Sequence, residues 1–181
     1  MSKKLFIILS VFFILTTSLY PFDGKRKGFV IGCGLGFAPL TKWSGDSPRA
    51  NENKAGFAAN IMIGYARNEH SMFVYESNVV IFNSDHFQDR YIAQGFNGFS
   101  WYYFLNPDGE SFFFTFGFGL SVFQVESCNP NNPEYGFLFG GGYELSRHSQ
   151  VGGYFCFGKT VSEHIDYNQL HFAILVTTVA F

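Results

Sequence analysis

The sequence predicts an all-β protein, an eight-stranded antiparallel up-and-down transmembrane β-barrel that follows a cleaved signal peptide. The first observation is an alternation of large apolar residues with small or polar ones, clearest in Phe112–Ser121. There, one face of an extended strand is aromatic and the other carries mostly Thr, Gly and Ser. The second observation is that longer and shorter connections alternate strictly between such segments. The third is the composition, 20% aromatic and only 14% charged, with 25 Phe and 20 Gly.

The N-terminal segment has the three parts of an export signal. Lys3 and Lys4 are its basic region, Leu5–Leu15 is its apolar run, and small residues follow. About eleven apolar residues are too few to span a bilayer comfortably, since a spanning helix needs roughly 20. We therefore expect residues 1–20 to be the signal peptide and residues 21–181 to be the outer-membrane β-barrel domain.

The first part of the domain contains four predicted strands. Phe29–Phe37 alternates large apolar residues mostly with glycine, and Phe57–Tyr65 alternates them with Ala, Asn, Met and Gly. Ser71–Phe82 sets Phe, Tyr, Val and Ile against polar residues. Arg90–Phe104 is rich in aromatic residues, but its parity is ambiguous, which suggests a β-bulge around Phe96–Gly98 that switches its faces.

The second part of the domain contains the other four predicted strands. After Phe112–Ser121 come Tyr135–Leu145, Gln150–Thr160 and Tyr167–Phe181, of which Gln150–Thr160 has the weakest pattern. Alternate links of an up-and-down barrel lie on opposite rims, and outer-membrane barrels have short periplasmic turns and longer extracellular loops. The longer links are Pro39–Lys54, Asn83–Asp89, Val125–Glu134 and Val161–Asp166, and the shorter ones are Ala66–His70, Leu105–Glu110 and Ser146–Ser149.

The C-terminal segment His171–Phe181 alternates apolar residues and ends on an aromatic one. With this segment and the strand pattern, the chain resembles the small eight-stranded outer-membrane barrels of Gram-negative bacteria, the OmpA/OmpX-like superfamily, at the level of architecture. The resemblance implies localisation in the cell outer membrane and contact with outer-membrane lipid and lipopolysaccharide. It also implies recognition by the barrel-assembly machinery through Ala173, Leu175, Val179 and Phe181.

A soluble eight-stranded barrel of the lipocalin or avidin kind is the alternative fold. Such a barrel needs large apolar residues inside and polar ones outside, whereas the second face here carries mostly Gly, Ser, Asn and Ala. Small residues suit a narrow interior filled by side chains, which argues against an open diffusion pore.

Several polar residues fall on the small-residue faces and are expected to point inward. Buried carboxylates are costly without partners, so we expect a polar network that includes Lys159, Arg90 or ordered water. A structural plug is favoured over a proton or ion path. The predicted network comprises Asn60, Glu76, Asn78, Glu144 and Lys159, and the predicted interfacial aromatic girdles include Tyr65, Trp101, Tyr103 and Tyr143.

Two medium loops carry the ingredients of an activated nucleophile, a hydroxyl, an acid and an imidazole. Residues adjacent in sequence rarely reach triad geometry, so solvated loop tips are the simpler interpretation. The weak catalytic candidates are Ser84, Asp85, His86, Ser162, Glu163 and His164.

Charge and cysteine content exclude other classes. The chain has 12 basic and 14 acidic residues, and loss of the signal lysines makes it more acidic, which argues against nucleic acid as a partner. Cys33, Cys128 and Cys156 are an odd set that cannot pair fully within the chain, and no Cys/His spacing suits a metal. No cofactor is expected.

The leading functional hypothesis is a non-enzymatic outer-membrane barrel whose loops Pro39–Lys54 and Val125–Glu134 contact something outside the cell or stabilise the envelope. Trp43 and the loop around Cys128 are candidate contact points. The alternatives are a lipid A-modifying enzyme of the acyltransferase or deacylase type and a narrow conduit for small hydrophobic molecules.

Overall fold

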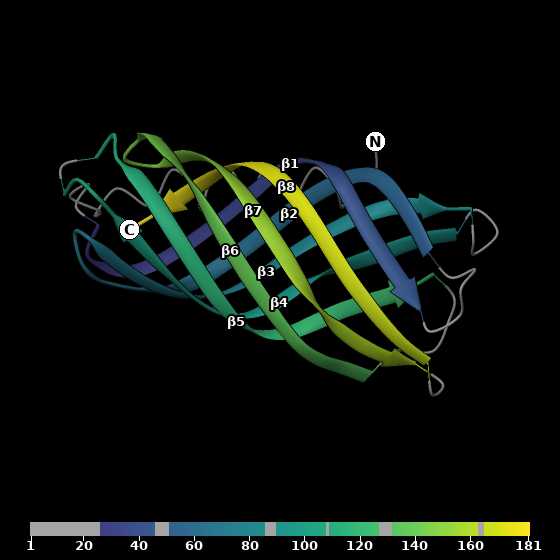
Figure 1. Ribbon diagram of the computed structural model, residues 1–181. Helices are drawn as coiled ribbons and strands as arrows, with labels where there is room; N and C mark the ends of the chain where they lie inside the picture. Colours follow the sequence, from purple (N-terminus) through teal and green to yellow (C-terminus); the bar gives the residue numbers. More distant parts are fainter. Residues whose placement is uncertain (1–25, 46–50, 86–89, 108, 127–131, 163–164) are drawn as a thin grey trace, which may run out of the picture.

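The computed structural model describes residues 26–45, 51–85, 90–107, 109–126, 132–162 and 165–181. Eight antiparallel strands close into a barrel in sequential order, with β1 paired to both β2 and β8 (Figure 1). The predicted up-and-down barrel is therefore confirmed, while the predicted signal peptide lies outside the described residues. The strands are β1 (Gly28–Gly45), β2 (Asn51–Asn68), β3 (Ser71–Ser84), β4 (Arg90–Phe104), β5 (Phe112–Val125), β6 (Asn132–Ser146), β7 (Ser149–Ser162) and β8 (Ile165–Ala180).

The two faces of β5 have the character that its alternation predicts. Phe112, Phe114 and Phe118 expose 61%, 60% and 57% of their surface on the outside of the barrel. Thr115 and Ser121, at odd positions, expose only 5% and 1% and lie inside. The inside and outside of the barrel are thus assigned by single-residue alternation, as in a membrane-spanning strand.

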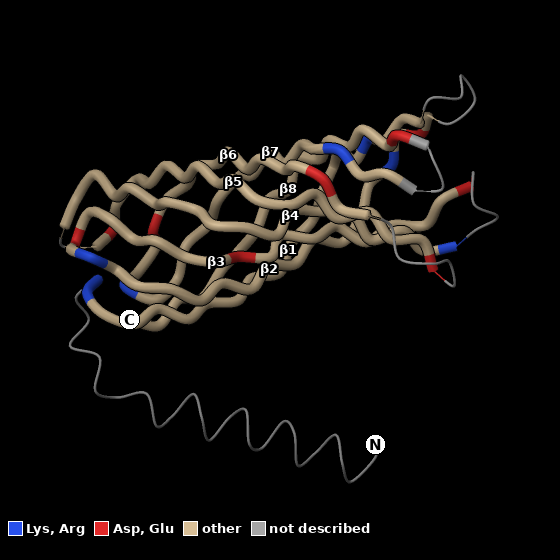
Figure 2. The backbone as a smooth tube through the Cα atoms, turned by 90° about the horizontal axis from the view of Figure 1, so that it is seen from below, with Lys and Arg blue, Asp and Glu red and all other residues tan. Residues whose placement is uncertain are grey.

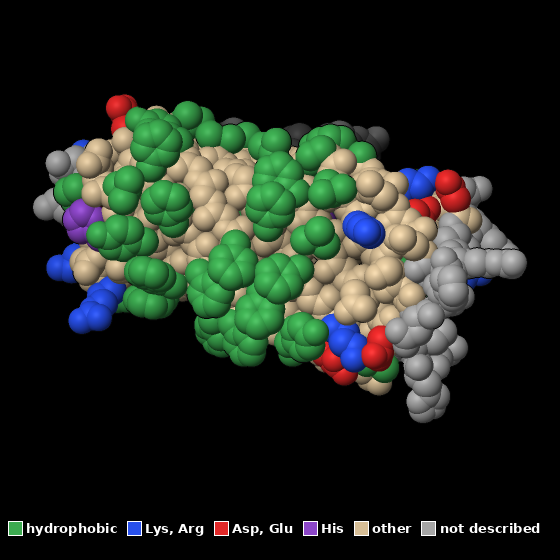
Figure 3. Space-filling view, viewed as in Figure 1, with side chains coloured by type: hydrophobic (Ala, Val, Ile, Leu, Met, Phe, Trp, Pro, Cys, Tyr) green, Lys and Arg blue, Asp and Glu red, His purple; other side chains and the backbone are tan. Residues whose placement is uncertain are grey.

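An apolar belt of outward side chains surrounds the barrel, and Figure 3 shows it over the middle of one face. The strands are 14 to 18 residues long, whereas a tilted strand needs about 9 to 11 residues to cross a bilayer. Most charged residues lie toward the two ends of the barrel (Figure 2). The strands therefore project beyond the hydrocarbon layer. Among the described residues, no helix is long and apolar enough to cross a membrane.

The two long loops are shorter than the sequence predicts. β1 continues to Gly45 and β2 begins at Asn51, so most of Pro39–Lys54 is strand. In the same way, β5 ends at Val125 and β6 begins at Asn132. The loop boundaries were wrong because the outward residues of these extensions are polar, so the hydrophobic alternation stops before the strands do.

A β-bulge in β1 decides the position of Trp43. The pairing of β1 shifts between Ala38 and Thr41, next to Pro39, which has no N–H to contribute to the ladder. The shift changes which positions face inward, and Trp43 becomes fully buried. Trp43 is therefore an interior residue, and its interpretation as a loop contact point was wrong.

The bulge expected in Arg90–Phe104 does not form. β4 pairs with β3 without interruption from Ser71 opposite Tyr103 to Ser84 opposite Arg90. Phe96 stays on the inner face because Gly98 and Gly117 make room for its ring. A Cβ on these glycines would approach that ring to 2.7 and 3.0 Å. Because these glycines leave space for the Phe96 ring inside the barrel, β4 keeps the same inward and outward positions without a bulge.

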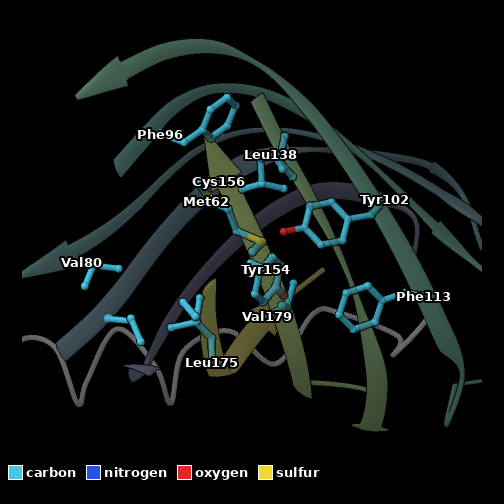
Figure 4. Packing of buried hydrophobic residues seen from close by; sticks show 14 of the residues in the cluster. Met62, Val80, Phe96, Tyr102, Phe113, Leu138, Tyr154, Cys156, Leu175 and Val179 are labelled. Carbon is cyan, nitrogen blue, oxygen red and sulfur yellow. The ribbon is translucent and has the colours of Figure 1, made fainter. Parts of the chain in front are cut away.

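Apolar and aromatic side chains pack inside the barrel (Figure 4). An eight-stranded barrel has an interior just wide enough for side chains to fill it. The largest interior residues include Met62, Phe96, Tyr102, Phe113, Leu138 and Tyr154, which come from the five strands β2, β4, β5, β6 and β7.

Candidate functional site

The end of the interior at the short turns corresponds to the periplasmic end of outer-membrane barrels, and the opposite end to the extracellular one. The periplasmic end is closed by Arg26, which lies just before β1. Its guanidinium donates from Nε to Oε1 of Glu144 at 3.2 Å and from Nη2 to Oε2 at 3.0 Å. It also donates to the backbone carbonyls of Glu69 and Asn106, in the two short turns β2–β3 and β4–β5. The guanidinium carbon lies 4.2 Å from the ring centroid of Phe104. Arg26 thus links β6, the β2–β3 turn and the β4–β5 turn at this rim.

Lys159 does not belong to the interior network, so that prediction was wrong. Inward positions of β7 include Tyr154, Cys156 and Thr160, and Lys159 therefore points outward. Its ammonium lies 2.6 Å from Asp166 and 3.6 Å from a carboxylate oxygen of Glu134. The hydrogen bond to Asp166 raises the pKa of Lys159. The alternation of Gln150–Thr160 is weak, so the sequence did not show which of its residues face inward.

Arg90, the other basic residue expected in the network, is exposed at the start of β4. The cation that reaches Glu144 is instead Arg26. No sequence pattern marked Arg26, because it precedes the first alternating segment.

The middle of the barrel holds a polar layer around Glu76. Its carboxylate accepts a hydrogen bond from the Tyr102 hydroxyl at 3.0 Å. Asn60 and Asn78 are buried beside each other as a cross-strand pair, and the hydroxyl of Thr177 donates to Asn60 Oδ1 at 3.5 Å. The structure therefore brings together three predicted residues, Asn60, Glu76 and Asn78. Within the described residues, no ion pair neutralises Glu76, and remaining polar atoms of this layer suit ordered water.

The extracellular end of the interior is closed by aromatic rings. Trp43 packs against Phe123 and Tyr167, with ring centroids 5.7 and 6.0 Å apart, and Phe123 stacks on Tyr167 at 5.1 Å. The indole N–H of Trp43 donates to Glu52 at 3.2 Å. Both ends of the barrel are therefore filled by interlocked side chains.

The strand extensions carry an extracellular collar of polar side chains outside the barrel. On the inner edge of the same end, the Lys54 ammonium lies 2.7 Å from Asp85 and 3.8 Å from Glu52. The collar and the cluster of Lys54, Asp85 and Glu52 together present hydrogen-bonding groups beyond the apolar belt. The collar comprises Lys42, Asn53, Asn83, Gln124, Lys159 and Asn168.

The catalytic candidates are only partly described. The Ser84 hydroxyl is buried and donates to Glu52, and the backbone N–H of Asp85 donates to the same carboxylate at 2.9 Å. Ser162 ends β7. His86, Glu163 and His164 lie outside the described residues, as does the side chain of Ser162. Ser84 and Asp85 thus share an acidic neighbour at the extracellular end.

The predicted assembly signal faces inward. Leu175 is fully buried, and Phe181 exposes only 2% of its surface. The lipid-facing positions of this part of β8 are occupied by Ile174 and Val176, which expose 47% and 58%. Recognition by the assembly machinery stays a prediction. The inward members of the signal are Ala173, Leu175, Val179 and Phe181.

Two cysteines have different surroundings. Cys33 is exposed on the outer face and Cys156 is buried inside, and both are free thiols. Cys128 lies outside the described residues. Within the described residues, no group of three or more His, Cys, Asp or Glu side chains is placed to hold a metal ion.

The predicted girdle residues lie on the outer face toward the short turns. Tyr65, Trp101 and Tyr103 expose 57%, 43% and 38% of their surfaces, and Tyr143 is half-buried against Phe112. Trp101 also donates from its indole N–H to the Ser71 hydroxyl at 3.4 Å. Amphipathic rings at this height suit the boundary between lipid and water.

Comparison with known proteins gives structural neighbours only. No protein-family model and no curated protein matches the chain. Neisserial surface protein A is 15% identical with a TM-score of 0.54, and 85% of this chain covers 97% of that one. OprG from Pseudomonas aeruginosa is 12% identical with a TM-score of 0.50, covering 87% and 98% of the two chains. Ail of Yersinia pestis, solved with the heparin analogue sucrose octasulfate, is 9% identical with a TM-score of 0.47, covering 83% and 99%.

The neighbours share the closed fold, and the barrel's own surface indicates its environment. The outward side chains form an apolar belt, as in strands that face lipid. The closed eight-stranded fold and this belt together support localisation in the outer membrane. The chain has the closed eight-stranded fold of small outer-membrane β-barrels.

Proposed function

We propose that this chain is a non-enzymatic outer-membrane protein that acts through its extracellular end, by stabilising the envelope or by contacting molecules outside the cell. The observation that carries the proposal is the extracellular collar, because it places polar groups where the strands leave the hydrocarbon layer. The packed interior supports the same view, since it leaves the surface as the place of contact.

The collar is suited to lipopolysaccharide, whose phosphate groups lie at the outer surface of the membrane. Lys42 points outward from β1 and is exposed, and it is paired in the sheet with Asn53. A lysine near an anionic membrane surface contributes about 1 kcal/mol of binding free energy. The collar lysines would therefore hold the barrel at a fixed height in the outer leaflet.

A binding experiment with matched variants tests this role. The purified barrel in vesicles is titrated with lipopolysaccharide. Lys42→Glu is expected to weaken binding by at least about fivefold, because losing the lysine costs about 1 kcal/mol and the new carboxylate adds repulsion. Arg67→Glu is the control, because Arg67 is also exposed and basic but lies at the opposite rim. Equal losses in both variants, or no loss in Lys42→Glu, would contradict a specific role of the collar.

Two further measurements separate the alternatives. Mass spectra of lipid A from cells with and without the gene are expected to be identical, and a changed acylation pattern would favour a lipid-modifying enzyme. The purified barrel is expected to be silent in planar bilayers, and steady conductance would favour a conduit.

A further inference from the structure

Two of the short turns carry a histidine at the same position. The β2–β3 turn consists of Glu69 and His70, and the β6–β7 turn consists of Arg147 and His148. In both, a serine begins the next strand. The turns lie at the periplasmic end of the barrel, where the C-terminal end of β8 is also found (Figure 1). The repeated position indicates that the two histidines share a role.

The ring of His70 completes a rung between β3 and β4. The register of these strands reaches Ser71 opposite Tyr103, so His70 and Phe104 are the next pair outward. The backbone carbonyl of His70 accepts from the Phe104 N–H at 2.8 Å, and its Nδ1 donates to the Phe104 carbonyl at 2.8 Å. An ordinary rung uses the backbone N–H for the second bond. In His70 that N–H donates to Asn68 Oδ1 at 3.0 Å, and the ring takes its place.

The ring of His148 makes the same rung between β7 and β8. Their register reaches Ser149 opposite Thr178, and His148 and Val179 are the next pair. The backbone carbonyl of His148 accepts from the Val179 N–H at 3.0 Å, and its Nδ1 donates to the Val179 carbonyl at 3.0 Å. On the other edge of β8, Val179 lies opposite Gly32 of β1. The end of the closing strand is therefore held on both edges.

The acceptor in each rung decides where the imidazole carries its hydrogen. A carbonyl oxygen only accepts, so Nδ1 of His70 and of His148 must be the donor, and the lone pair of the neutral ring is then on Nε2. The contact therefore depends on one particular nitrogen of the side chain and not on the bulk of the ring.

We propose that His70 and His148 are histidine latches, in which Nδ1 and the backbone carbonyl bind both backbone groups of one residue on the neighbouring strand. The latch at His148 keeps the C-terminal end of β8 from separating from β7. A strand end with unpaired N–H and C=O groups is a template for pairing with another chain, and the latch removes that opportunity at Val179. The latches are independent of the extracellular collar, at the opposite end of the barrel.

Hydrogen exchange of the Val179 amide tests the latch in the full-length barrel, labelled with nitrogen-15 valine in nanodiscs. The partner of this N–H is the backbone carbonyl of His148, which every variant keeps, so its exchange reports opening of the rung. His148→Gln is expected to raise the exchange rate by about fivefold, the effect of losing one typical hydrogen bond. His148→Asn is expected to leave the rate unchanged, because its amide nitrogen lies at the same point along the side chain as Nδ1. Equal rates in the two variants would overturn the proposal.

Val176 is the internal reference for this measurement. It lies further along β8 from the latch, opposite Leu35 of β1 and Val151 of β7. Its exchange rate is expected to be the same in wild type and in His148→Gln, because the latch acts only on the strand end. An equal rise at Val176 and Val179 would show general destabilisation and would overturn the latch.

A measurement on the wild-type chain does not depend on the folding of any variant. Nitrogen-15 spectra of the imidazoles, recorded where the rings are neutral, are expected to show the Nδ1–H tautomer for His70 and His148. The Nε2–H tautomer at either residue would overturn the assignment of that latch. As a matched repeat, the Phe104 amide is expected to exchange faster in His70→Gln but not in His70→Asn, and equal rates there would contradict a shared role.

Discussion

Arg26 and Glu144 form a bidentate ion pair inside the periplasmic end of the barrel. Two nitrogen–oxygen distances of 3.2 and 3.0 Å join them, and each side chain exposes only 3% of its surface. Forked pairs of this kind are the stronger class of charge-assisted hydrogen bond. Removing one partner of such a pair strongly destabilises the fold, because the other charge then stays buried without compensation.

Arg26→Ala should therefore destabilise the barrel by about 3 to 5 kcal/mol. The measurement is the free energy of unfolding in urea, with the protein folded in lipid vesicles. Lys27→Ala is the matched control, since Lys27 is the next residue and is exposed. A loss below about 1 kcal/mol, typical of surface pairs, would contradict a buried ion pair.

Phe116→Arg should cost about 2 to 4 kcal/mol, because it places a charge on the lipid-facing side of β5 near the bilayer midplane. Thr115→Ser, on the adjacent inward position, should cost much less. Unfolding in urea from vesicles measures both. Equal tolerance at the two positions would mean that the faces of β5 are assigned wrongly.

The two tryptophans of the chain should respond differently to brominated lipids. Trp43 is fully buried inside the barrel, whereas Trp101 exposes 43% of its surface on the outer face. In Trp43→Phe, the remaining Trp101 fluorescence should be strongly quenched by bromine on the acyl chains. In Trp101→Phe, quenching of Trp43 should be weak, and strong quenching there would contradict the parity change at the β1 bulge.

Inward and outward tyrosines should differ in their contribution to stability. Tyr102 is fully buried, and its hydroxyl donates a hydrogen bond to Glu76. Tyr102→Ala should therefore lower the free energy of unfolding by about 3 to 5 kcal/mol, as for other buried aromatic residues. Tyr65 exposes 57% of its surface, and Tyr65→Ala should cost about 1 kcal/mol or less. Comparable losses in urea unfolding would show that the interior is loosely filled.

The number of strands, their order and most of their faces could be predicted from the sequence. Single-residue alternation is a local signal, and a bilayer outside with a narrow interior makes it strong in segments such as Phe112–Ser121. Strand ends were harder to predict, because beyond the apolar belt the outward residues are polar and the hydrophobic alternation stops before the strand does. The extension of β1 to Gly45 is the clearest example.

The candidate site was less predictable because its contacts join distant parts of the chain. Glu76 and Asn78 could be placed inside from their parity alone. The cation for Glu144 could not, since Arg26 lies 118 residues away and outside any alternating segment. Lys159 was wrongly assigned to the inner face, because the alternation in β7 is too weak to show which of its residues face inward.

The contacts of Arg26 also constrain the order in which the barrel can be completed. Its hydrogen-bond partners lie 43, 80 and 118 residues along the chain, in the first two short turns and in β6. A half-formed sheet, with β6 not yet curled round to the N-terminal side, leaves this guanidinium and the Glu144 carboxylate without each other. Pairing of these charges therefore requires β6 to have reached the N-terminal side of the mouth, and until then both groups remain hydrated.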